Sequence, residues 1–230
     1  MSKNTWVMIS QPVKEGSAGV RNYVNYLTNP NHKNHQNTNS IFTTFGNDKL
    51  FLQSTVAKCS EVDYKNQQAG KGGRPMGSYA QSFVFSLPAG VPQPTAEQWK
   101  QITEVIVLDL CSRLKISPKH ADKYIFANVH DQAKPDLNIT VCKARNGEVF
   151  KDLQKKGIIE PLKRAFTVQY QLLTGFSVGD YQRKTTGAKK RLPKPKFEAV
   201  KKKKKQKELE EKPIVKPIEN FHPNRINPRF

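Results

Sequence analysis

The chain has 230 residues, with 39 Lys and Arg against 19 Asp and Glu, so its formal net charge is +20. This excess indicates a polyanionic partner, nucleic acid in the first place and an anionic membrane surface in the second. Three separated cysteines without a Cys-x-x-Cys pair argue against a disulfide framework and a zinc ribbon. No apolar run approaches the roughly 20 residues of a membrane span, and the first ten residues lack a signal-peptide pattern. We therefore expect a cytoplasmic protein with no membrane partner.

The first elements of the chain are a predicted strand and a predicted helix. Alternation over residues 5–13 predicts the strand, and the helix begins near Ser17 and stops at Asn29-Pro30. Tyr23 and Tyr26 lie three apart and therefore share one side of this helix. A tyrosine in such a place is ordinarily a core or rim residue with its hydroxyl in water.

A loop rich in Asn and His follows over residues 31–39 and is expected to be exposed. Its His32 and His35 form a His-x-x-His pair that could ligate a metal. No nearby Cys, Asp or Glu completes such a set, so contacts to phosphate are the favoured interpretation.

The middle of the chain reads as two strands joined by a polar connection. Residues 48–59 alternate in a strand-like way, and residues 78–87 form a second strand with a strongly apolar side. Between them, residues 64–77 are rich in glycine and carry Lys71 and Arg74. Their spacing is not that of a nucleotide-binding loop, so a flexible loop over a DNA groove, or a plain disordered excursion, fits better.

Helices are predicted before and after a late pair of strands. Thr95 caps a clear core-packing helix that extends to Leu114. Two further helical segments lie around residues 149–153 and 159–173, the last of which ends at Gly175.

Between these helices, residues 124–130 and 136–142 alternate polar and apolar side chains and are expected to pair as a hairpin. That pairing places His130 beside Asp136 and Asn138 on one polar face. One imidazole and two oxygen groups suit a divalent cation, and the oxygens favour Mg²⁺ or Mn²⁺ over Zn²⁺. The simpler alternative is a half-buried edge hairpin with an ordinary polar face.

The composition changes after Gly179, where 17 Lys and Arg face 6 Asp and Glu. We expect residues 1–178 to form the folded domain and residues 179–230 to form a basic, flexible tail, in which Lys201, Lys202 and Lys203 contact DNA. The remaining part of the chain is still basic, so the domain should carry its own surface for phosphate.

Two short motifs resemble the relaxases of mobilisable plasmids, which are similar to MobA and belong to the HUH endonuclease superfamily. Residues 23–28, Tyr-Val-Asn-Tyr-Leu-Thr, resemble the nucleophile segment of that family. Residues 131–138, Asp-x-x-x-Pro-Asp-Leu-Asn, resemble its His-x-Asp-x-x-x-Pro-His-x-His metal motif. Asp136 and Asn138 stand where most members have paired histidines, and the colicin-plasmid mobilisation branch has an acidic residue and an Asn there.

One departure from the family pattern concerns the remaining histidine. The family has it two residues before the Asp, where this chain has Val129, whereas His130 is adjacent to Asp131. A slip of one residue changes faces on a strand. Either a bulge or the strand end turns His130 into the site, or His32 or His35 supplies the ligand, or metal binding is weakened.

The resemblance implies an α+β fold, with an antiparallel sheet, a ferredoxin-like core and helices packed on one face. It also implies that Tyr26, with Tyr23 as the alternative, attacks a phosphodiester of single-stranded DNA at a transfer origin. The expected cation is Mg²⁺ or Mn²⁺, held by His130, Asp136 and Asn138, and Asp131 would orient a ligand or accept the tyrosine proton. No nucleotide cofactor is needed, and accessory mobilisation proteins are further expected partners.

Two other functions remain open at this stage. A replication initiator or a transposase would use the same chemistry. A non-catalytic basic nucleic-acid-binding protein would need neither Tyr26 nor a metal, since the Lys-rich tail alone would give affinity.

Overall fold

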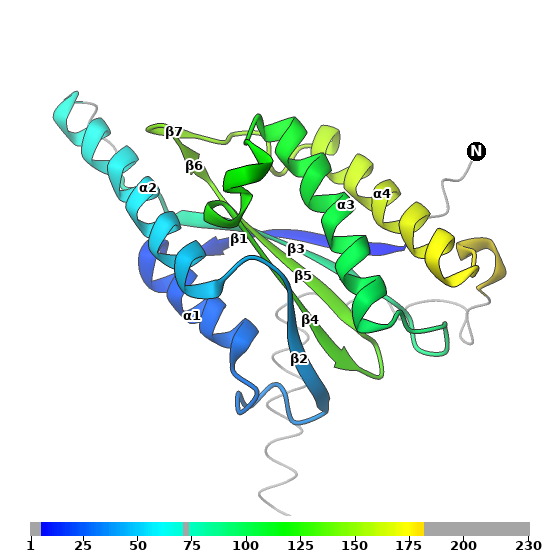
Figure 1. Ribbon diagram of the computed structural model, residues 1–230. Coiled ribbons are helices and arrows are strands. Elements are labelled where there is room, and N and C mark those ends of the chain that lie inside the picture. Colours follow the sequence, from blue (N-terminus) through cyan, green and yellow to red (C-terminus); the bar gives the residue numbers. More distant parts are fainter. Residues whose placement is uncertain (1–5, 71–73, 182–230) are drawn as a thin grey trace, which may run out of the picture. The chain divides into compact units, whose positions relative to one another are not determined.

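The computed structural model describes residues 6–70 and 74–181, which contain four long helices, seven strands and two short 3₁₀ helices (Figure 1). In chain order these elements are β1 (Val7–Lys14), α1 (Gly16–Thr28), β2 (Thr38–Phe45), α2 (Asp48–Gln68), β3 (Ser78–Ser86), α3 (Ala96–Leu114), η1 (Pro118–Lys123), β4 (Ile125–Gln132), β5 (Asp136–Cys142), β6 (Ala144–Arg145), β7 (Glu148–Val149), α4 (Lys156–Thr174) and η2 (Val178–Asp180). The predicted tail lies outside the described residues from 182 onwards. No helix in the described part of the chain is long and apolar enough to cross a membrane.

Five strands form one antiparallel sheet in the order β1-β3-β5-β4-β2, and β6 and β7 form a small separate ribbon. The predicted hairpin is therefore the β4–β5 pair at the centre of the sheet, and its description as an edge hairpin was wrong. Because β3 and β2 pair with its outer sides, nearly all of its residues are buried.

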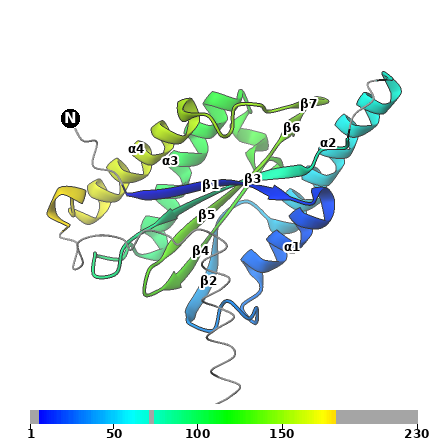
Figure 2. The same cartoon turned by 180° about the vertical axis from the view of Figure 1, so that it is seen from behind.

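The predicted α+β class with an antiparallel sheet is confirmed, but the helices occupy both faces of the sheet rather than one. Apolar residues of α3 and α4 pack with Ile125, Val129 and Ile139 on one face. Residues of α1 and α2 pack with Phe126 and Cys142 on the other. Figure 1 shows α3 and α4 side by side, and Figure 2 shows the sheet from behind, where α1 lies. Two separate apolar clusters result, and the polar part of the β4–β5 pair belongs to the face of α1.

Residues 48–59, predicted as a strand, belong instead to helix α2. Asn47 caps it by accepting from the amide of Leu50. The buried positions are Phe51, Thr55, Cys59 and Val62, and their spacing of three and four is that of one helix face. The alternating Leu and Val residues that suggested a strand are only partly buried, so they did not mark the packed face.

Two smaller parts of the prediction also need correction. Residues 149–153 form no helix: Glu148 and Val149 belong to strand β7, and a turn follows. Strand β2 was not among the predicted elements, and its first two residues lie inside the loop expected over residues 31–39. The predicted strands at β1 and β3 and the helices α1, α3 and α4 are present, and α4 ends at Gly175 in the left-handed conformation.

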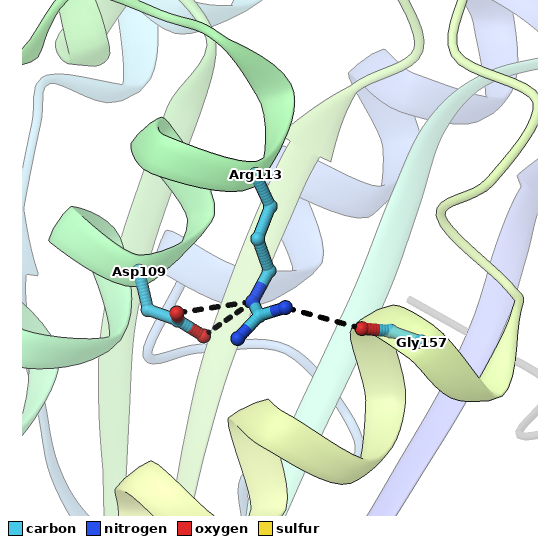
Figure 3. A network of polar contacts seen from close by, with 3 residues as sticks. All are labelled: Asp109, Arg113 and Gly157. Carbon is cyan, nitrogen blue, oxygen red and sulfur yellow. Dashed lines mark hydrogen bonds and ion pairs between the residues drawn. The ribbon is translucent and has the colours of Figure 1, made fainter.

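Helices α3 and α4, which cover the same face of the sheet, are joined by a polar contact near the start of α4. Arg113 of α3 pairs through Nε with Asp109 at 2.9 Å and donates from Nη1 to the carbonyl of Gly157 at 3.3 Å (Figure 3). The carbonyl of a residue in the first turn of α4 is thus fixed to α3. This contact holds the two helices in register on the side of the sheet away from α1.

Candidate functional site at the end of helix α1

The end of α1 is fixed to the centre of the sheet by its last buried residue, Leu27. The carbonyl oxygen of Leu27 accepts from Nε2 of His130 at 3.1 Å and also from Nδ2 of Asn128. Carbonyls in the last turn of a helix have no partner within the helix, so side chains must satisfy them when they are buried. Strand β4 supplies these donors, and this places the residues just before Leu27 over β4 and β5.

Tyr26 consequently lies in a cluster of three histidine rings. Its ring centroid is 4.8 Å from that of His35, 5.0 Å from that of His32 and 5.7 Å from that of His130. The rings of His35 and His130 are 4.6 Å apart. These residues come from α1, the loop after it and β4, so the fold alone brings them together.

The two candidate tyrosines are in different environments. Tyr23 Oη forms a 2.6 Å hydrogen bond with Ser82 of β3, and burial raises the pKa of Tyr23. Tyr26 Oη makes no hydrogen bond to a described residue. Burial also raises the pKa of Tyr26, and the negative charge of Asp136 raises it further. Of the two, Tyr26 is therefore the tyrosine whose oxygen bonds to no described residue and whose ionisation responds to Asp136.

The paired strands bring Asp136 opposite His130, as the alternation predicted. Burial raises the pKa of Asp136, and hydrogen bonds with Ser86 and Gln132 oppose that rise. Gln132 donates from Nε2 to the carboxylate at 3.0 Å. Asn138 lies two residues on and donates from Nδ2 to the backbone carbonyl of Asp136 at 3.3 Å. The side-chain oxygens of Asp136 and Asn138 are thus on the face of the sheet that carries Tyr26.

The loop after α1 is mostly exposed, as the sequence suggested, but His35 within it is buried, with 5% of its surface exposed. The carbonyl of Asn29 accepts from His35 Nδ1 at 2.8 Å and from the amide of His32 at 3.2 Å. The amide of His35 in turn bonds to the carbonyl of His32. These bonds close the loop around Tyr26 and make His35 part of the cluster.

The donors in this cluster fit a hard divalent cation in kind, but they do not form a complete cage. His35 Nε2 and Asn128 Oδ1 are buried without a partner, and Asp136 adds a carboxylate. Within residues 6–70 and 74–181, no three His, Cys, Asp or Glu side chains converge closely enough to hold a metal ion. A cation here would take further ligands from amide oxygens, water or a phosphate, as Mg²⁺ usually does.

Other predicted site residues lie away from this cluster. By strand alternation, Asp131 is on the face of β4 opposite to His130, so it is not placed to receive the Tyr26 proton. Arg74 is exposed in the loop before β3. The carbonyl of Gly77 in the same loop accepts from the amide of Gly16, the first residue of α1, so this loop lies at the end of the helix opposite to Tyr26. Lys71 and Lys201, Lys202 and Lys203 lie outside the described residues.

The sequence did not single out Asn128, Ser82 or Gln132, which orient the cluster. Asn128 was visible as the polar residue between the apolar positions of β4, on the same face as His130. Its pairing with a helix carbonyl was not readable, because the two residues are 101 positions apart.

Comparisons with known proteins give structural neighbours only. No family model matches the chain, and no curated protein sequence matches it. A solved structure of the MobM relaxase domain (MOBV; Mob_Pre), Mn-bound and bound to plasmid pMV158 oriT DNA at pH 6.8, is 14% identical. It covers 84% of this chain and 98% of its own, with a TM-score of 0.48. A structure from work on vancomycin resistance transfer in Staphylococcus aureus is 9% identical and has a TM-score of 0.44. It covers 80% of this chain and 98% of its own. Similarity at this level does not assign the chain to a family.

Proposed function

We propose that the protein is a relaxase, which nicks and rejoins single-stranded DNA at a plasmid transfer origin by attack of Tyr26 on a phosphodiester. The observation that carries this proposal is the position of Tyr26. Its hydroxyl, which bonds to no residue within 6–70 and 74–181, belongs to a ring packed against His35 and His130 and lies within electrostatic reach of Asp136. Two motifs that are far apart in the sequence and resemble relaxase motifs thereby meet at one place.

In the proposed reaction the phenolate oxygen of Tyr26 forms a bond to phosphorus, and the bond from phosphorus to the 3′ oxygen breaks. The products are a 5′-phosphotyrosyl protein and a strand with a free 3′-hydroxyl, which takes up a proton. The reverse attack by that hydroxyl rejoins the strand. The covalent link conserves the energy of the broken bond, so no nucleotide cofactor is required.

The phenol must be activated, because its reference pKa is about 10 and its surroundings here raise that pKa further. We propose that Asp136 and Asn138 hold Mg²⁺ or Mn²⁺ together with a histidine of the cluster, for which His130 is the sequence-based candidate. Bound there, the cation would offset the charge of Asp136 and stabilise negative charge on the phosphate oxygens. The chain's own residues fix Tyr26 through Leu27 and exclude water from one side of it.

The basic residues have a separate part in this proposal. His32, Arg74, Lys71 and the lysines 201–203 would contact DNA phosphates and contribute affinity rather than base recognition. The chain is strongly basic on both sides of residue 179, so these contacts can come from the domain as well as from the tail.

A covalent adduct assay tests the function. The full chain is incubated with single-stranded DNA from its own transfer origin and Mg²⁺ or Mn²⁺, and then denatured. We expect an adduct that resists denaturation, forms with the wild type and with Tyr23→Phe, and is lost in Tyr26→Phe and with a chelator. No adduct with any divalent metal would reject the proposal in favour of a non-catalytic nucleic-acid-binding protein. An adduct that persists in Tyr26→Phe and disappears in Tyr23→Phe would move the nucleophile to Tyr23.

A further inference from the structure

One histidine nitrogen of the cluster is buried and has no hydrogen-bond partner among the described residues. His35 Nδ1 lies 2.8 Å from the carbonyl oxygen of Asn29, and because a carbonyl can only accept, Nδ1 must carry the proton. In the neutral ring Nε2 therefore has a free lone pair. That atom is buried, and no described residue donates a hydrogen bond to it.

An unpaired acceptor of this kind is uncommon in a folded protein, because burial removes its hydrogen bond to water without replacing it. The His35 ring does not lie in purely apolar surroundings that would account for an unpaired nitrogen. The ring of His35 lies against Tyr26 and His130, in a loop closed by backbone bonds to Asn29. An imidazole whose Nδ1–H is held by a backbone carbonyl and whose Nε2 is free has the arrangement that proteins use for metal-binding histidines.

The other two histidines of the cluster have their nitrogens arranged differently. His130 directs Nε2 at the Leu27 carbonyl, so that nitrogen carries the proton, and the lone pair of the neutral ring is on Nδ1, which is not among the buried atoms without a partner. His32 accepts at Nδ1 from the amide of Asn34 at 3.2 Å, so in the neutral ring the proton is on Nε2. Among the described histidines of this cluster, His35 is thus the one with a buried nitrogen that has no partner.

We propose that His35, rather than His130, supplies through Nε2 the imidazole ligand of the divalent cation, and that His130 is a positioning residue that fixes Leu27 and Tyr26. This inference rests on the proposed function for the identity of the ion. Asp136 and Asn138 keep their places as oxygen ligands. The departure of the sequence from the relaxase motif is then resolved by a histidine from a different segment of the chain.

The test follows the histidine side chains of the full-length protein, labelled with ¹⁵N at histidine. In the metal-free state we expect the rare Nδ1–H tautomer for His35 and the Nε2–H tautomer for His130. Paramagnetic Mn²⁺, added alone in substoichiometric amounts, should broaden the His35 resonances first and most strongly. This measurement needs no substitution, so it does not depend on whether a variant folds.

Mn²⁺ affinity, measured by electron paramagnetic resonance of the free ion, gives a second readout. We expect His35→Ala to weaken Mn²⁺ binding at least tenfold, and His130→Ala to weaken it less than threefold. His120→Ala, which alters an exposed histidine in η1, should leave the affinity unchanged. A His35→Gln variant keeps the bulk of the side chain and should lose affinity as His35→Ala does.

Broadening of His130 before His35, or unchanged Mn²⁺ affinity in both His35 variants, would overturn the inference. So would the absence of Mn²⁺ binding, because the free nitrogen would then hold only water. The adduct assay keeps this result separate from the proposed function: a Tyr26 adduct without Mn²⁺ at His35 rejects the ligand and retains the relaxase. Mn²⁺ at His35 with no adduct would support the ligand and reject the relaxase.

Discussion

Nε2 of His130 donates to the carbonyl oxygen of Leu27 over 3.1 Å, and this bond joins the last turn of α1 to the centre of the sheet. Asn128, two residues earlier on β4, donates to the same oxygen. The position of Tyr26 depends on these two donors, because Tyr26 immediately precedes Leu27. The polar face of β4 thus orients the candidate nucleophile directly.

Replacing Asn128 by Ala should lower the free energy of unfolding by about 1–3 kcal/mol, because a buried carbonyl loses one of its two donors. Urea denaturation measures the change. Asn66→Ala, on an exposed position of α2, is the matched control and should change stability by less than about 0.5 kcal/mol. Equal effects of the two substitutions would show that the contact with Leu27 contributes nothing.

Stability should fall as the pH drops below about 6.5, the reference pKa of histidine in the unfolded chain. Burial lowers the pKa of His130 in the folded protein; the Leu27 carbonyl opposes this, and His35 adds to it. As the pH falls, the unfolded state therefore binds the proton before the folded state does. The contribution of neutral His130 to the free energy of unfolding is present above about pH 6.5 and is lost as the pH falls through the folded-state pKa. Urea midpoints measured at several pH values with a chelator present should fall less steeply in His130→Gln. An identical slope in this variant would contradict the assignment.

Two glycines in helices should respond in opposite ways to alanine. A Cβ atom on Gly19 would lie 1.6 Å from the carbonyl oxygen of Lys14, whereas one on Gly157 would meet nothing within 4 Å. Gly19→Ala must push the start of α1 away from β1 and should cost about 1–3 kcal/mol. Gly157→Ala should leave stability unchanged or raise it by up to about 1 kcal/mol, since alanine favours the helix. A thermal-shift comparison checks both, and a destabilised Gly157→Ala with a tolerated Gly19→Ala would reverse the expectation.

Removing the residues after Gly187 should weaken DNA binding and reduce its dependence on salt, while the nick stays at the same phosphate. The deleted segment is rich in Lys and Arg, and each lysine that neutralises a phosphate steepens the salt dependence without reading bases. Fluorescence anisotropy over a range of salt concentrations gives the slope, and a sequencing gel gives the nick. A nick that moved would show that the tail takes part in choosing the site.

The central hairpin was the part of the molecule that the sequence predicted best. Alternation is complete over β5 and is interrupted over β4 only by Phe126, and both strands are short and directly connected, so the pairing of His130 with Asp136 follows from local pattern alone. Helix α3 was equally clear, because Thr95 and Gln98 form its capping box.

The parts that the sequence did not predict depend on contacts between distant segments. The sequence did not predict helix α2, because Leu50 and Leu52 stand beside its buried positions and are only partly buried, so the apolar residues did not mark one side. Burial of His35 arises from bonds of its loop to Asn29 and from packing on Tyr26 and His130, none of which a local pattern reports. The metal ligands suggested by the family motif could therefore be named from the sequence, but the unpaired nitrogen of His35 could not be predicted from it.

Mass spectrometry of the purified protein–DNA adduct tests the central claim most directly. Trypsin should release residues 22–33 as one peptide that contains both Tyr23 and Tyr26, since it cleaves after Arg21 and after Lys33. After nuclease digestion, fragmentation should place the remaining 5′-phosphonucleotide on Tyr26. A phosphonucleotide on Tyr23, on any residue outside this peptide, or on none, would contradict the account.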